Sequence, residues 1–131
     1  MGMRFLLDTH VLLWLIGDPE EVPEAVRETL ADPVHVLCVS AVSALEVATK
    51  QRLGKLAVDG LTEAWDQRVA DIGATELVVT SAHARLAGTL RWDHRDPFDR
   101  LLVAQATIEA MTLVTVDSAM RDLRAPAILS W

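Results

Sequence analysis

Residues 4–16 read Arg-Phe-Leu-Leu-Asp-Thr-His-Val-Leu-Leu-Trp-Leu-Ile, and this stretch decides the fold class. Its first four residues predict a short buried strand, and residues 10–16 combine apolar character with good helix formers. Gly17-Asp18-Pro19 then breaks the predicted helix. The strand therefore passes into a helix through only Asp8 and Thr9, which leaves an acid at the carboxyl end of the strand.

The same alternation of strand and helix continues along the rest of the sequence. Further strands are predicted at residues 34–39, 76–79, 113–116 and 127–129. Helices are predicted at residues 23–31, from the N-cap Ser40 to about Arg52, and at 61–72, 81–90, 96–111 and 117–123. Strands joined through helices imply right-handed crossovers and a parallel sheet with helices on both faces. We predict one α/β domain over residues 1–131, with three layers (α/β/α) and about five strands.

The composition is typical of a compact domain of this size. Of the 131 residues, 51% are hydrophobic and 24% are charged, which is enough apolar material for a core without disulfides. The single cysteine, Cys38, lies in an apolar run and predicts a buried thiol in a reducing compartment. No apolar run approaches the roughly 18 residues of a membrane span. We expect a cytoplasmic protein that does not enter a membrane.

Acidic residues stand at the predicted ends of two strands and on two helices. Asp8 follows the first strand and Asp117 follows the strand at 113–116, whereas Glu46 lies within a helix and Asp96 and Asp99 open another. In open parallel sheets, ligands bind beyond the carboxyl ends of the strands, where the strand order reverses. The acids that follow strands are therefore candidates for a site.

Each of these acids also has an ordinary structural explanation. Asp8 and Asp117 suit the N-caps of the helices that follow them, and Asp96-Pro97-Phe98-Asp99 is a near-ideal helix start. Glu46 precedes Lys50 by four residues, the spacing of a surface ion pair worth only ~0.3–0.5 kcal/mol. Caps and pairs do not explain the set of five taken together.

Several convergent carboxylates are what Mg²⁺ or Mn²⁺ requires. Two such ions about 3.5 to 4 Å apart support in-line hydrolysis of a phosphodiester bond, leaving 5′-phosphate and 3′-hydroxyl ends. Other chemistries are poorly supplied, because the sequence has no Gly-rich phosphate loop, no Gly-x-Ser-x-Gly elbow and no zinc-ligand spacing of Cys and His. The residues thus favour a metal-dependent phosphodiesterase.

The net charge of -7 opposes a nucleic-acid partner. Of the 19 acidic residues, however, five form the proposed site, which leaves 14 against 12 basic residues. A local basic rim would then suffice, and the candidates near the acids in sequence are Lys50, Arg52, Lys55, Arg91, Arg95 and Arg100. We expect RNA phosphate contacts from Lys50, His94, Arg95 and Arg100. The other histidines, His10, His35 and His83, are predicted to be structural, and the four tryptophans are too dispersed for base stacking.

Five segments together carry a resemblance to a known family, the PIN-domain toxins of the VapBC kind. They are residues 6–14, Ser40 to Ala48 with Lys50, residues 52–56, His94 to Leu102, and residues 113–117. The resemblance spans almost the whole sequence. One departure is Ala44-Leu45, where this subgroup often has Leu-Trp before the acid, and it concerns the packing beside Glu46.

The resemblance implies a PIN-like fold and an Mg²⁺- or Mn²⁺-dependent endoribonuclease, the toxin of a type II toxin-antitoxin system. Asp8, Glu46, Asp99 and Asp117 match the catalytic acids, Asp96 matches an additional metal-binding acid, and Thr115 matches an auxiliary hydroxyl. The implied partners are RNA, a homodimer mate and a small DNA-binding antitoxin of the VapB kind. The apolar helix at residues 10–16 and the tryptophan-bearing segments offer surface for the two protein partners.

Two alternatives remain open from the sequence. One is a PIN-like scaffold that has lost catalysis and binds RNA or protein. The other is a phospho-accepting receiver domain, which requires an aspartate at the end of a mid-chain strand, whereas the strand at 34–39 ends at Ser40.

Overall fold

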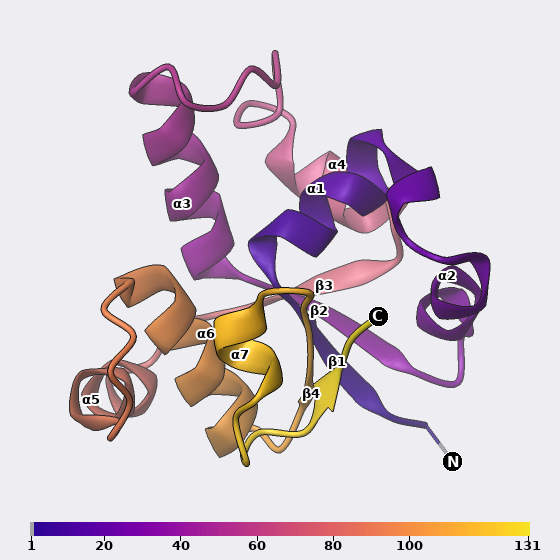
Figure 1. Cartoon of the computed structure of the whole chain (residues 1–131). Coiled ribbons are helices and arrows are strands. Elements are labelled where there is room, and N and C mark those ends of the chain that lie inside the picture. Colours follow the sequence, from indigo (N-terminus) through magenta and orange to yellow (C-terminus); the bar gives the residue numbers. More distant parts are fainter. Residues whose placement is uncertain (1) are drawn as a thin grey trace.

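Five parallel strands form one central sheet, in the order β3-β2-β1-β4-β5 (Figure 1). The computed structural model describes residues 2–131. The strands are β1 (Arg4–Leu7), β2 (Val36–Ser40), β3 (Ala74–Leu77), β4 (Thr112–Val114) and β5 (Ile128–Leu129). The chain builds outward from β1 in one direction through β2 and β3, and in the other through β4 and β5. The strand order therefore reverses between β1 and β4.

Helices cover both faces of this sheet, which confirms the predicted three-layer α/β/α architecture. The helices are α1 (Thr9–Gly17), α2 (Glu24–Ala31), α3 (Ala41–Arg52), α4 (Trp65–Asp71), α5 (Ser81–Thr89), α6 (Pro97–Ile108) and α7 (Ser118–Arg121), with a 3-10 turn at Pro19–Glu21. In Figure 1, α1, α2 and α4 lie on one side of the sheet and α5, α6 and α7 on the other. None of the helices in residues 2–131 is long and apolar enough to span a membrane.

The alternation of side chains along β1 divides the core in two. Phe5 and Leu7 pack into the cluster beneath α1, α2 and α4, whereas Leu6 packs into the cluster beneath α6 and α7. Successive side chains of a strand point to opposite faces, so one strand supplies both cores. Helix α3 contributes Val47 to the first cluster and Val42 to the second. The strand that carries Asp8 at its end is thus fixed from both sides.

Two predicted elements are displaced from where the structure has them. The strand predicted at residues 76–79 is β3, two residues earlier, because Gly73 (φ 75°) ends the preceding helical segment and Ala74 pairs with Leu37 of β2. Val78 and Val79 lie beyond the strand and are exposed. The helix predicted from residue 61 begins only at Trp65, after a series of turns. In the first case, pairing with β2 overrides local apolar character.

Other elements differ from the prediction only at their ends. The helix predicted to reach Met111 stops at Ile108, where Ala110 adopts a left-handed conformation (φ 54°). The backbone N–H of Met111 donates to the carbonyl of Ala106, the long bond of a Schellman motif. Ser40 caps α3 by accepting from Val42 N, and Cys38 is a buried free thiol, both as predicted.

Candidate metal centre

A pocket of about 350 Å³ opens at the point where the strand order reverses. All five acids singled out in the sequence line it, and these are Asp8, Glu46, Asp96, Asp99 and Asp117. They come from the end of β1, the middle of α3, the start of α6 and the end of the β4 segment. Parallel strands direct their carboxyl ends to one edge of the sheet, so residues more than 100 positions apart meet there.

Asp8 and Asp117 are joined through Thr115. The hydroxyl of Thr115 is fully buried, donates to Asp8 Oδ2 at 2.8 Å and accepts from the backbone N–H of Asp117 at 3.0 Å. Asp8 occupies the N-cap position of α1 but makes no side-chain cap bond. A capping role for its carboxylate is therefore wrong, and the side chain is directed to the pocket instead. Asp117 does cap its helix, through Oδ1 and Ala119 N.

Glu46 is a buried acidic residue. Glu46 is 6% exposed, and its Oε2 lies 2.7 Å from Lys50 Nζ. The predicted pair with Lys50 is thus present, but it is not the solvated surface pair that the spacing alone suggested. The other oxygen, Oε1, is buried and has no hydrogen-bond partner within the described residues. A buried carboxylate oxygen without a partner is costly unless a cation binds it.

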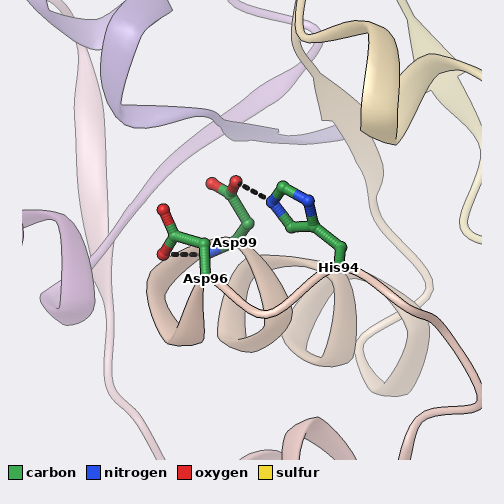
Figure 2. A group of neighbouring side chains, drawn as sticks. All are labelled: His94, Asp96 and Asp99. Atoms are coloured by element: carbon green, nitrogen blue, oxygen red, sulfur yellow. Dashed lines mark hydrogen bonds and ion pairs between the residues drawn. The ribbon is translucent and has the colours of Figure 1, made fainter.

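Asp96, Asp99 and His94 form a compact group at the start of α6 (Figure 2). Asp96 Oδ1 caps the helix by accepting from Phe98 N at 2.8 Å and Asp99 N at 3.4 Å. Asp99 is buried one turn further on, and its Oδ2 lies 2.6 Å from His94 Nε2. One potential ligand atom from each of the three residues falls within 4.8 Å of the others. This group could hold a metal ion.

Across the pocket, each of the five carboxylates has one oxygen fixed by a protein donor. The donors are Thr115 for Asp8, Lys50 for Glu46, backbone amides for Asp96 and Asp117, and His94 for Asp99. Such hydrogen bonds orient a carboxylate as a metal ligand. The hard oxygen donors, together with the orphaned Oε1 of Glu46, fit a divalent cation such as Mg²⁺ or Mn²⁺.

Burial disfavours the ionised form of the acids in the pocket. It raises the pKa of Asp8 and raises that of Asp99 to about 6, and the neighbouring carboxylates add to both shifts. Bonds from Thr115 and His94 oppose these shifts only in part. The pKa of Lys50 is raised, chiefly by its hydrogen bond to Glu46. A bound cation would stabilise the ionised acids directly.

Only some of the basic residues predicted to surround the site line the pocket. Lys50 and Lys55 line the pocket, and Arg52, Arg91 and Arg95 are exposed without lining it. The guanidinium of Arg100 donates to four backbone carbonyls, those of Ala87, Leu90, Trp92 and His94. These bonds use four of its five N–H donors, so little of the fork remains for the RNA phosphate contact expected from the sequence. Arg100 faces the interior of the preceding loop because an arginine fork satisfies carbonyls that no helix or strand pairs.

Two residues that the sequence analysis did not single out support the site. The hydroxyls of Thr9 and Ser43 are buried and lie 2.8 Å apart, which joins the start of α1 to α3 beside the acids. Thr9 directly follows Asp8, and Ser43 lies one helical turn before Glu46, so helical spacing was the available signal. His10, predicted to be structural, also lies on the pocket wall.

Comparison with known proteins places this fold in a family. The profile of the PIN domain family matches residues 5–126. The chain is 31% identical over 123 residues to Ribonuclease VapC22 of Mycobacterium tuberculosis (strain ATCC 25618 / H37Rv), covering 92% of each chain. Similar solved folds include VapBC2 of Rickettsia felis bound to a promoter DNA fragment (TM-score 0.72, 17% identity, 98% and 99% of the two chains). Another is FitAB bound to a DNA fragment (TM-score 0.66, 22% identity, 96% and 94%). The chain therefore belongs to the PIN domain family, and the likeness to VapC proteins that its motifs carry is confirmed.

Proposed function

We propose that this chain is a divalent-metal-dependent endoribonuclease and the toxin of a type II toxin-antitoxin pair. The observation that carries the proposal is the convergence of five carboxylates in one pocket, each with one oxygen held by a protein donor. The similarity to a protein named Ribonuclease VapC22 supports the same activity.

Asp8, Glu46, Asp99 and Asp117 would hold Mg²⁺ or Mn²⁺, with Asp96 as an additional ligand. Two such ions, when bound, supply an activated water and neutralise the leaving oxygen of an in-line phosphodiester displacement. Thr115 keeps Asp8 and Asp117 in fixed relation, and the bond from Lys50 orients Glu46. Lys50 and Lys55 on the pocket wall provide positive charge toward an RNA phosphate.

The proposed protein partners are a VapB-like antitoxin and a second copy of this chain. Solved structures with this fold are described as VapBC complexes. Helix α1 carries four consecutive apolar residues, 13–16, that remain partly exposed, and Trp14 lies near Trp131 with ring centroids 6.3 Å apart. This surface adjoins the acidic pocket through Leu13. An antitoxin tail that placed a cation among the acids would block the site.

RNA cleavage by the purified chain tests the proposed activity. We expect cleavage of RNA in Mn²⁺ or Mg²⁺, none in EDTA, and products with 5′-phosphate and 3′-hydroxyl ends when the ends are mapped in total RNA. Activity that persists in EDTA, with contaminating nuclease excluded, would contradict the two-metal mechanism. RNA binding without cleavage would instead favour the catalytically inactive scaffold.

Co-expression tests the partner. A neighbouring gene for a small DNA-binding protein should give a stable complex with this chain and relieve the growth arrest that the chain alone causes. A chain that stays monomeric and ignores that product would contradict the toxin-antitoxin assignment while leaving the nuclease assignment intact.

A further inference from the structure

The position of Asp99 depends on a residue outside the set of acids. His94 Nε2 lies 2.6 Å from Asp99 Oδ2, slightly less than the ~2.7 Å at which the usual range for a nitrogen donor and an oxygen acceptor begins. The side chain of Asp99 is 13% exposed and that of His94 is 27% exposed. Solvent competes weakly for this bond, so the imidazole fixes which way the carboxylate turns.

The loop that carries His94 is itself held rigidly. Arg100 donates to the carbonyls of Leu90, Trp92 and His94, at 2.8, 2.7 and 3.0 Å, and to Ala87 at the end of α5 at 2.8 Å. Leu90, Trp92 and His94 lie in a segment without helix or strand, so the guanidinium supplies donors that regular secondary structure would otherwise provide. Arg100 follows Asp99 directly in α6. Helix α6 therefore carries both Asp99 and Arg100, the residue whose guanidinium clamps the loop of His94.

The plane of the imidazole is also fixed. The rings of Trp92 and His94 stack with centroids 4.6 Å apart and an interplanar angle of 26°. Asp96 ends the loop by capping α6, so the segment is anchored on both sides of His94. Figure 2 shows His94 and Asp99 pointing toward one another above the start of the helix, with Asp96 beside them.

We propose that His94 is a positioning residue for Asp99, held in place by the Arg100 clamp and the Trp92 stack, and that it turns the other carboxylate oxygen of Asp99 toward the divalent cation. This inference rests on the proposed metal-dependent function. It replaces the expected contact between His94 and RNA phosphate, because Nε2 is already engaged by Asp99. A partner behind a metal ligand of this kind contributes about 10- to 100-fold to metal affinity.

Binding of Mn²⁺ alone, followed by the EPR signal of the free ion, tests the proposal without RNA. We expect His94→Ala to weaken Mn²⁺ binding by about 10-fold or more. His94→Gln should restore much of it, because the glutamine amide nitrogen lies the same number of bonds from the backbone as Nε2. His35→Ala is the matched control, since His35 is also half-buried but lies at the opposite edge of the sheet, bonded to Met3 N. It should bind Mn²⁺ as the wild type does.

A second pair of measurements keeps the outcome decisive. Arg100→Lys retains the charge but loses the fork, and it should weaken Mn²⁺ binding in a chain whose far-ultraviolet spectrum is unchanged. Equal Mn²⁺ affinity in wild type and His94→Ala would overturn the proposal. So would a nitrogen coupling in the pulsed EPR spectrum of bound Mn²⁺ that is present in the wild type and in His10→Ala but absent from His94→Gln, because it would make His94 a direct ligand. If the wild type itself neither bound Mn²⁺ nor cleaved RNA, the proposed function would fail instead.

Discussion

Within residues 2–131, two histidine–carboxylate pairs have opposite character. His83 of α5 is 2% exposed and lies 3.3 Å from Glu109 Oε2, and its Nδ1 accepts from Thr80 N in a capping box. His94 lies in an irregular loop, is partly exposed, and lies 2.6 Å from Asp99 Oδ2. The first histidine closes a helix end, whereas the second holds a carboxylate of the pocket.

Both pairs join an imidazole nitrogen to a carboxylate oxygen, so the difference lies in the position of the carboxylate in the fold. Glu109 follows the last turn of α6, away from the pocket, whereas Asp99 is in the first turn, at the carboxyl edge of the sheet. A single helix thus carries one pair for stability and one for the site. The two pairs should respond differently to substitution.

Loss of cleavage is the largest effect that separates the two pairs. Asp99→Asn and Asp8→Asn should each reduce RNA cleavage by more than about 100-fold, because even residues behind metal ligands contribute up to that factor. Glu109→Gln, the same kind of change in the other pair, should leave the rate unchanged. Initial rates on a defined RNA in Mn²⁺ measure this. Full activity in both aspartate variants would mean that these acids are not ligands.

Stabilisation of the folded chain by metal should depend on one of the two pairs only. At a hundredfold excess over Kd, Mn²⁺ should stabilise the wild type by about 2.7 kcal/mol, or roughly 5 to 10 °C in melting temperature. The shift should be smaller in Asp99→Asn and complete in Glu109→Gln. Thermal melts with and without Mn²⁺ provide the comparison. An undiminished shift in Asp99→Asn would indicate that the ion binds elsewhere.

The buried pair should dominate stability. His83→Ala removes a buried ring and its bonds to Thr80 and Glu109, and should cost about 2 kcal/mol of unfolding free energy. His94→Ala, in a loop, should cost less. Urea titration in EDTA measures both changes. If the two variants were equally destabilised, the distinction between a structural and a positioning histidine would not hold.

A further effect is a pH dependence of the stability of the metal-free chain. Burial raises the pKa of Asp99 to about 6 in the folded state, above its ordinary value of 3.8, so the folded state holds the proton more tightly. The stability that this group contributes is full below about pH 4, falls as the pH rises toward 6, and is then level. Asp99→Asn should remove that decline.

Urea titrations of the wild type and Asp99→Asn between pH 4 and 7, in EDTA, should therefore diverge across this window, with the variant gaining relative stability as the pH rises. A stability difference that did not change with pH would show that the surroundings of Asp99 do not disfavour its ionised form. Glu109→Gln serves as the comparison outside the pocket.

Much of the fold and of the site was predictable from local sequence. The strand at residues 4–7 followed at once by a helix, and the repeat of that pattern, predicted the parallel sheet and its helical layers. The acids that follow β1 and β4 were predicted to meet because parallel strands share a carboxyl edge. The spacing from Ser40 to Arg52 located a capped helix, and Glu46 lies within it as predicted.

The sequence by itself indicated which acids would gather at the pocket, four at strand ends and at a helix start and Glu46 within a capped helix. Only the tertiary structure decided which groups each of these side chains contacts. It turned Asp8 from a cap toward Thr115, buried the pair of Glu46 and Lys50, and bound Arg100 to loop carbonyls rather than leaving it free for RNA. The physical reason is that a side chain satisfies whichever donors and acceptors folding leaves unpaired near it, and those belong to segments distant in sequence.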